Sequence, residues 1–129
     1  MKLNSFSKAE HLYGDKNINR LFSEGQAFIA YPFRVVCLFL SDEEEIPVRV
    51  MVSVSKKRFK RAVKRNKVKR LMRESYRANK HGLTELLTDK NKQAYISFQY
   101  VANEILSFQY IETRMKMALD KIKKLAEQA

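Results

Sequence analysis

The sequence KKRFKRAVKRNKVKRLMRESYRANK, residues 56–80, carries half of the basic residues of this chain. Thirteen of its 25 residues are Lys or Arg, against 26 in the whole protein, and Glu74 is its one acidic residue. Helix signals begin near Ala62 and continue to about Asn79, and His81-Gly82 follows as a stop. The stretch therefore predicts a basic loop that leads into a basic helix.

A helical wheel separates the apolar and charged residues of this predicted helix. With Val68 at zero and 100° per residue, the side within about 80° of Val68 is expected to face a core. That side consists of Val68, Leu71, Met72, Ser75 and Tyr76. A second set, which we call the basic ridge, lies between about 100° and 200°. The basic ridge consists of Asn66, Lys69, Arg70, Arg73 and Arg77, and Arg65 and Lys67 flank it near the helix start.

Clustered positive charge indicates a polyanionic partner. The formal net charge is +12 and the pI about 9.9, which favours nucleic acid, with an anionic membrane surface as the alternative. Arg binds phosphate through two parallel hydrogen bonds, and Lys acts as a point charge. The amide of Asn66 both donates and accepts, so it suits a base edge or a 2′-hydroxyl. The residues predicted to bind RNA are Lys56, Lys57, Arg61, Arg65, Asn66, Lys67, Lys69, Arg70, Arg73 and Arg77.

Length and composition favour a single domain over residues 1–129. With 45% hydrophobic residues and few Gly or Pro, the chain can bury a core without a disulfide or a structural metal. No apolar run approaches the length of a membrane span, and Cys37 is the single cysteine. We therefore expect a cytoplasmic protein with no membrane partner.

The remaining pattern predicts the elements of an α+β sandwich. Residues 1–14 are expected to form a partly ordered arm, and residues 15–25 a short helix. Asp15 is expected to cap the start of this helix, and Gly25 to end it in the left-handed conformation.

Strand signals follow on both sides of an acidic turn. Residues 27–40 are rich in β-forming residues, and residues 48–55 alternate between Val and other residues. We expect them to pair as an antiparallel hairpin across a long solvated loop at 41–45. After the basic stretch we expect a helical turn, a third long strand and a closing helix: residues 83–88, 94–101 and 109–127.

A second surface for RNA is predicted beside the first helix. Ile18 and Phe22, facing Phe33 or Val36 on a strand, would line a groove in which single-stranded bases pack. Ordinary core packing of the same four residues is the alternative, and both interpretations stay open at this point.

Protein-based catalysis has little support in the sequence. His11 and His81 have no partners at the spacing of a metal site or a catalytic triad. Cys37 lies in an apolar strand and is expected to be a core residue. No glycine-rich phosphate loop is present, so we expect neither catalytic nor metal-ligating side chains.

The basic stretch and the strand before it resemble the bacterial ribonuclease P protein component. The hallmark of that family is an Arg-Asn-Arg motif that opens a helix, matched here by Arg65-Asn66-Lys67 behind the strand Val52-Ser53-Val54-Ser55. The pattern Ile18-x-x-Leu21-Phe22-x-x-Gly25 matches the first helix of the family. Lys67 departs from the motif, because it keeps the charge but loses the planar fork of Arg. The loop 58–61 also lacks the glycine that many members carry.

The resemblance implies both a fold and a function. The fold would be a two-layer α+β sandwich of the ribosomal protein S5 domain 2 type. It would have a four-stranded sheet, about three helices and a left-handed βαβ crossover. The function would be that of the ribonuclease P protein subunit, with one protein per RNA. The RNA subunit would use Mg²⁺ to remove the 5′ leader of precursor tRNA.

The resemblance also assigns roles to particular residues. The residues implied to face the catalytic RNA are Arg65, Asn66, Lys67, Lys69, Arg70 and Arg73. Those implied to line the leader cleft are Ile18, Phe22, Phe33 and Val36.

Two other functions are weighed against this one. A binding module without processing activity, such as a ribosomal or nucleoid-associated protein, would share the basic ridge but need no leader groove. A peripheral membrane or partner-helix binder would use the basic helix as an amphipath, but the apolar side of that helix is narrow and a sheet needs it.

Overall fold

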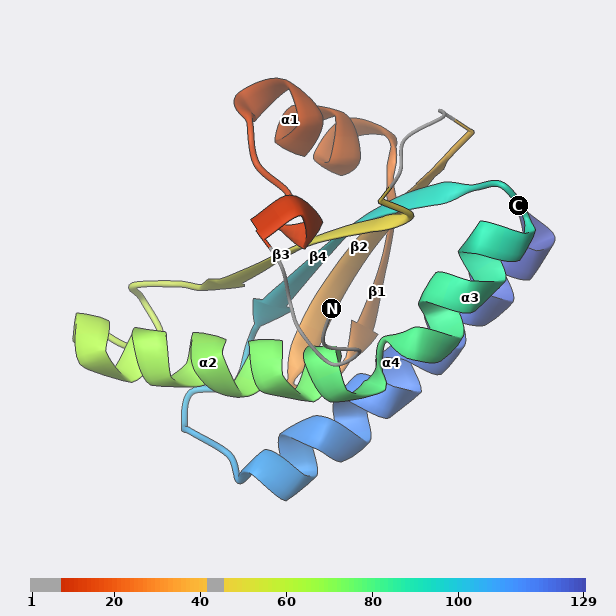
Figure 1. Cartoon of the computed structure of the whole chain (residues 1–129). Coiled ribbons are helices and arrows are strands. Elements are labelled where there is room, and N and C mark those ends of the chain that lie inside the picture. Colours follow the sequence, from red (N-terminus) through yellow and green to blue (C-terminus); the bar gives the residue numbers. More distant parts are fainter. Residues whose placement is uncertain (1–7, 42–45) are drawn as a thin grey trace.

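The computed structural model of the chain describes residues 8–41 and 46–129. It has one four-stranded mixed sheet with the strand order β1-β2-β4-β3 (Figure 1). The strands are β1 (Gln26–Ala30), β2 (Phe33–Leu40), β3 (Val48–Val54) and β4 (Gln93–Tyr100). The helices are η1 (Lys8–Glu10), α1 (Asp15–Glu24), α2 (Ala62–Asn79), α3 (His81–Asp89) and α4 (Phe108–Gln128). The predicted α+β class is confirmed, with four α-helices in the described ranges rather than about three.

The strand pairing corrects the expected hairpin. Residues 27–40 divide at Tyr31-Pro32 into β1 and β2, which pair with each other in antiparallel fashion. β2 and β3 are not neighbours, because β4 lies between them, antiparallel to β2 and parallel to β3. The prediction that residues 27–40 and 48–55 pair as an antiparallel hairpin is therefore wrong. β4 suits the central position, since nearly all of its side chains are buried.

The parallel pair β3 and β4 decides where the loops of the molecule meet. The chain leaves β3, passes through α2 and α3, and returns as β4. Because parallel strands end at the same edge of a sheet, the loops after β3 and after β4 both leave from that edge (Figure 1).

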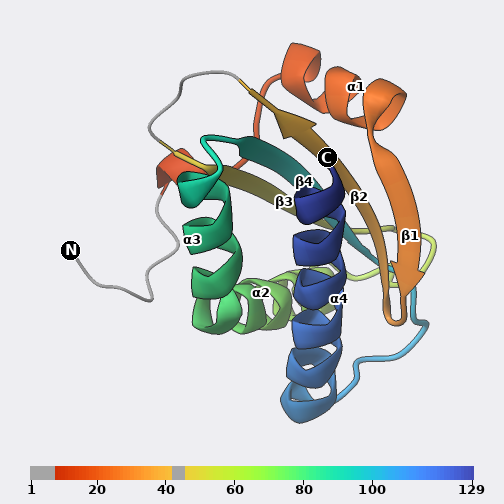
Figure 2. The same ribbon diagram turned by 90° about the vertical axis from the view of Figure 1, so that its right-hand side faces the viewer.

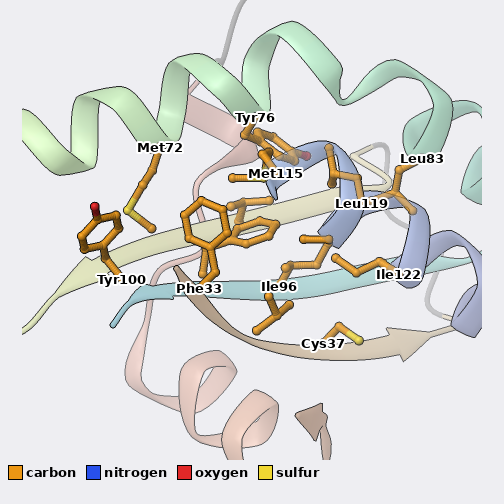
Figure 3. Close-up of a cluster of buried hydrophobic side chains, with 14 of the residues drawn as sticks. Phe33, Cys37, Met72, Tyr76, Leu83, Ile96, Tyr100, Met115, Leu119 and Ile122 are labelled. Atoms are coloured by element: carbon orange, nitrogen blue, oxygen red, sulfur yellow. The ribbon is translucent and has the colours of Figure 1, made fainter. Parts of the chain in front are cut away.

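The sheet has helices on both faces. Figure 2 shows α2, α3 and α4 on one face and α1 on the other. The larger core lies under α2, α3 and α4 and includes Phe33, Tyr76, Ile96 and Met115 (Figure 3). The smaller core lies under α1 and contains Leu12, Leu21, Val36, Leu40 and Tyr95. β2 serves both cores, because alternate side chains of a strand point to opposite faces.

Both ends of α1 differ from the sequence prediction. Asp15 is the first helical residue rather than the cap, and Gly14 precedes it without a side-chain capping bond. Gly25 is extended, with φ −78°, so it is not left-handed. Glycine is required there for space, because an added Cβ would lie 2.4 Å from the carbonyl oxygen of Leu21 and 3.0 Å from Cγ1 of Val36. Gly25 thus lets the end of α1 approach β2.

Candidate RNA interface

The helix α2 divides its surface between core and charge as the helical wheel predicts. Val68, Met72, Ser75 and Tyr76 are buried, and Leu71 packs at the edge of the larger core. The helix begins and ends at the predicted residues. The basic ridge therefore lies on the side of α2 that turns away from the sheet.

The basic ridge is most accessible in the N-terminal half of α2. Asn66 and Arg70 of the ridge are exposed, as is the flanking Lys67, whereas Lys69, Arg73 and Arg77 are partly buried. The first turn of α2 contains no acidic residue to offset the positive charges. This half of the helix is therefore a surface suited to phosphate groups.

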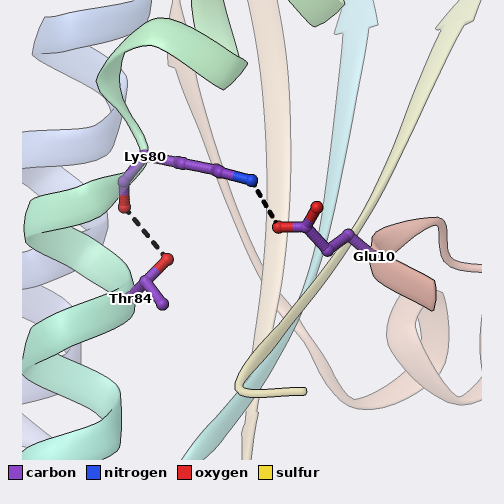
Figure 4. Close-up of polar contacts among 3 residues, drawn as sticks. All are labelled: Glu10, Lys80 and Thr84. Carbon is purple, nitrogen blue, oxygen red and sulfur yellow. Dashed lines mark hydrogen bonds and ion pairs between the residues drawn. The ribbon is translucent and has the colours of Figure 1, made fainter. Parts of the chain in front are cut away.

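The arm before α1 packs beside the C-terminal half of α2. The backbone N–H of Leu12 donates to the carbonyl of Val50 at 2.9 Å, so the arm extends along β3. The Glu10 carboxylate pairs with Lys80 at the end of α2 (Figure 4). Burial and the positive charge of Arg73 lower the pKa of His11, and Glu10 opposes them. Residues 8–14 of the arm are thus held against β3 and α2, and residues 1–7 lie outside the described residues.

Arg65 holds the basic loop against α2. Its Nη1 donates to the carbonyl oxygens of Phe59 at 2.7 Å and Lys60 at 2.8 Å. Phe59 is buried, and its ring centroid lies 6.2 Å from that of Tyr100. The predicted RNA-binding residues of this loop, Lys56, Lys57 and Arg61, are exposed. Arg65 is predicted to bind RNA, and the structure shows that it also shapes the basic loop. The sequence did not indicate this second role.

The four predicted leader-cleft residues do not share a surface. Phe33 is fully buried in the larger core, on the face opposite α1. Val36 is buried under α1, Ile18 is partly buried at the edge of the same small core, and Phe22 is 48% exposed. The placement of Phe33 beside Ile18 and Phe22 is therefore wrong, because residues 33 and 36 point to opposite faces of β2. Core packing, the alternative interpretation, describes Phe33 and Val36.

An accessible row of side chains crosses the whole sheet on the α1 face. We call it the open sheet row, and register partners define it as Ile29, Arg34, Gln99 and Ser53. Each of the four is at least partly exposed. The row combines a cation, an amide, a hydroxyl and an apolar side chain, so it can both hydrogen-bond and pack against bases. Strand alternation could have predicted these residues. Gln99, for example, lies between Phe98 and Tyr100, which both point into the larger core, so its side chain has to point to the opposite face.

The titratable and metal-binding side chains offer little chemistry. Among the described residues, no group of three or more His, Cys, Asp and Glu side chains is placed to hold a metal ion. Cys37 is a core residue, as predicted, and burial raises the pKa of its thiol to about 11. Within the same ranges, no helix is long and apolar enough to cross a bilayer.

Comparison with known proteins agrees with this geometry. A family model described as Ribonuclease P matches residues 6–123. The chain belongs to the ribonuclease P protein family. The ribonuclease P protein component of Porphyromonas gingivalis is 47% identical over 116 residues, which cover 90% of this chain and 85% of the relative. The ribonuclease P protein component of Chlorobaculum tepidum is 38% identical over 109 residues, which cover 78% of this chain and 70% of the relative. As a ribonuclease P protein component, the chain is a subunit of a tRNA-processing endoribonuclease whose catalysis resides in RNA.

Solved ribonuclease P proteins share the fold. The Staphylococcus aureus RNase P protein superimposes with a TM-score of 0.71 at 23% identity, covering 90% of this chain and 97% of that one. The Thermotoga maritima RNase P protein gives a TM-score of 0.67 at 22% identity, and the superposition covers 87% of this chain and 96% of that one. Both likenesses concern the architecture of the sheet and helices.

Proposed function

We propose that this ribonuclease P protein binds the RNA subunit of the enzyme through the N-terminal half of α2 and the basic loop before it. The observation that carries this proposal is the exposure of Asn66, Lys67 and Arg70 on the side of α2 away from the sheet. Phosphate contacts by such residues supply affinity, and the amide of Asn66 suits a 2′-hydroxyl or a base edge. We expect one protein per RNA, acting in the cytoplasm.

The 5′ leader of precursor tRNA is proposed to bind across the open sheet row. Arg34 offers a charged fork for phosphate, and the Gln99 amide offers donors and acceptors for bases. Ile29 and Phe22 supply exposed apolar surface on β1 and α1. These residues replace Phe33 and Val36 in the cleft that the family resemblance implies.

The Mg²⁺ ions of the reaction are proposed to lie on the RNA subunit. The described side chains do not fit a metal site, because no suitable cluster of His, Cys, Asp and Glu is present among them. We therefore assign the protein the tasks of binding and orienting RNA, and no step of the hydrolysis.

The decisive experiment is cleavage of precursor tRNA at low Mg²⁺ by the RNA subunit of the same organism, with and without this protein. We expect the protein to accelerate cleavage, because its cations reduce the repulsion between the two RNAs. Absence of stimulation, with a protein that is folded by circular dichroism, would contradict the proposal.

The proposed leader site has its own test. Affinity of the holoenzyme for precursor tRNA should exceed its affinity for tRNA without a leader, and Gln99→Ala should reduce that preference. A binding module without a processing role would bind both RNAs equally. Lys116→Ala, on the exposed side of α4, is the matched control and should leave the preference unchanged.

A further inference from the structure

The strand β1 lies at the outer edge of the sheet and pairs with β2 alone (Figure 2). Among residues 8–41 and 46–129, no backbone hydrogen bond other than those with β2 reaches it. The opposite outer strand, β3, is covered by the arm, since the backbone N–H of Leu12 donates to the carbonyl of Val50. Alternate backbone N–H and C=O groups of β1 therefore point away from the sheet and can pair with another strand.

The strand β1 also lacks the features with which proteins protect such an edge. Its sequence QAFIA contains no charged residue and no proline, and its pairing with β2 has no bulge. Ile29 is 64% exposed on the α1 face, and Phe28 is partly buried against the larger core on the α4 face. The free edge thus lies between an apolar side chain on one face of the sheet and α4 on the other.

One side of α4 runs beside β1 and carries a row of accessible side chains, which we call the α4 stripe. Its members follow each other at spacings of three or four residues: Tyr110, Arg114, Met117, Lys121 and Lys124. The Arg114 guanidinium lies 5.2 Å from the ring centroid of Tyr110, and its Nη1 lies 3.6 Å from the sulfur of Met117. Nζ of Lys121 lies 5.0 Å from the ring centroid of Phe28, which connects the α4 stripe to β1.

A hollow of about 480 Å³ opens in the α4 stripe toward the C-terminal end of the helix. Its lining residues are Met117, Asp120, Lys121, Lys124, Leu125 and Gln128. Met117, which is 51% exposed, and Leu125 supply its apolar part. The Asp120 carboxylate already pairs with Nζ of Lys123 at 3.2 Å. The hollow therefore combines apolar surface with a surplus of positive charge.

We infer that β1 and the α4 stripe bind an extended segment of a protein partner in which acidic and apolar residues alternate. Added as a further strand beside β1, the segment forms backbone hydrogen bonds with the free edge. Side chains of a strand alternate between the two faces of a sheet, so every second residue lies over the α4 stripe and the others lie beside Ile29. Acidic residues suit the first position because of Lys121 and Lys124, and apolar residues suit the second.

Two other occupants suit this surface less well. A second copy of the chain carries the same net charge of +12 and brings its own cations toward those of the α4 stripe. RNA is attracted by the cations, but the alternating donors and acceptors of a free strand edge match another strand rather than a phosphate chain. The inference goes beyond the proposed function, because the site lies apart from α2 and the basic loop and shares only Ile29 with the open sheet row.

The probe for this site is a blocked heptapeptide in which Glu and Val alternate, beginning and ending with Glu. Titrated into isotope-labelled protein, it should shift the NMR signals of the backbone amides of β1 and α4 and slow hydrogen exchange in β1. The same residues with all Val adjacent should bind more weakly, because acidic side chains then fall on both faces. A version that is N-methylated at every residue keeps its charges but cannot donate to β1, so it should not bind.

A pair of charge reversals on α4 tests the role of the α4 stripe. Lys124→Glu should raise the dissociation constant of the heptapeptide at least about threefold, because it replaces an attraction by a repulsion. Lys116→Glu is the matched control, since it reverses another exposed lysine of α4 that lies outside the stripe and the hollow. It should leave the dissociation constant within this margin. Equal losses in the two folded variants would show that only net charge attracts the peptide, which would overturn the inference.

Three further results would overturn it. The first is an absence of shifts in β1 and α4, or shifts confined to α2, where the basic ridge attracts any anion. The second is equal affinity for the parent and the N-methylated peptide. The third is a single-stranded uridine heptanucleotide that shifts the amide signals of α4 as strongly as the peptide does, which would assign the α4 stripe to RNA. None of these results bears on the stimulation of cleavage, so the proposed function is tested separately.

Discussion

Glu10 and Lys80 lie 70 positions apart in the chain, and their side chains form an ion pair with Oε1 and Nζ 2.6 Å apart. The pair is largely withdrawn from solvent, since the Lys80 side chain is 7% exposed and that of Glu10 18%. The Lys80 carbonyl also accepts a hydrogen bond from Oγ1 of Thr84 (Figure 4). The arm is thereby tied to the junction of α2 and α3, at the end of the proposed RNA-binding helix.

Removing one partner of this pair should destabilise the fold. Glu10→Gln removes the carboxylate that lies 2.6 Å from the largely buried Lys80 ammonium, which should cost about 3 kcal/mol in the free energy of unfolding by urea. Glu24→Gln is the matched control, because its pair with Arg20 is mostly exposed and should contribute less than about 1 kcal/mol. Combining Glu10→Leu with Lys80→Met should recover most of the loss. Similar losses for Glu10→Gln and Glu24→Gln would show that the first pair is not buried in solution.

His11 should make the stability of the protein depend on pH. Burial and Arg73 lower the pKa of His11 below its ordinary value of 6.5, so the folded protein takes up this proton less readily than the unfolded chain. The stabilisation that comes from a neutral His11 is therefore fully present above pH 6.5 and is lost as the pH falls through the pKa of the folded protein. Relative to His11→Asn, the wild type should lose stability as the pH falls below the ordinary histidine pKa of 6.5. An NMR titration that places the pKa of His11 at or above 6.5 would disprove this.

Periodic patterns explain how much of the fold the sequence predicts. The core side of α2 follows from helical spacing around Val68, and the faces of β3 follow from its alternation. Both are local properties, set by the geometry of a single element. The same alternation, applied to β2, would have placed Phe33 and Val36 on opposite faces of the sheet. It would also have placed Arg34 on the face of Val36.

Long-range pairing explains what the sequence does not predict. β2 and β4 are both apolar enough for a central strand, and no local signal tells which of them neighbours β3. The contact of Arg58 with Asn103, 45 positions apart, arises only after β3 and β4 are parallel. The proximity of the loops after β3 and β4 can for that reason not be predicted from the sequence.

Gly25 should not tolerate a methyl group. In Gly25→Ala, the new Cβ would lie 2.4 Å from the backbone oxygen of Leu21 in α1 and 3.0 Å from that of Cys37 in β2, so the backbone at the end of α1 has to change its path. We expect a loss of about 2 kcal/mol in the free energy of unfolding. Gly82→Ala is the control, because its Cβ meets the flexible end of Lys123 and lies in a helix, where Ala is favoured by up to about 1 kcal/mol. If both variants are equally stable, α1 does not approach β2 this closely.

The thiol of Cys37 should be unreactive toward thiol reagents in the folded protein. Burial raises the pKa of its thiol to about 11, and the side chain is fully enclosed in the larger core. The thiolate is the reactive form, so a thiol reagent at pH 8 should label the native protein only as fast as the core opens. In denaturant the same reagent should label one thiol per chain at once. Rapid labelling without denaturant would mean that the core around β2 is open.

Arg70 and Arg73 should differ in a way that separates RNA binding from packing. Arg70 is exposed, so Arg70→Ala should reduce the salt slope for RNA-subunit binding by about 0.9 and leave stability and the pKa of His11 unchanged. Arg73 is partly buried, and its charge lowers the pKa of His11. Arg73→Ala should therefore raise the pKa of His11 in an NMR titration, whatever its effect on RNA. Should Arg70→Ala move the His11 titration and Arg73→Ala leave it in place, the arm packs on a different side of α2.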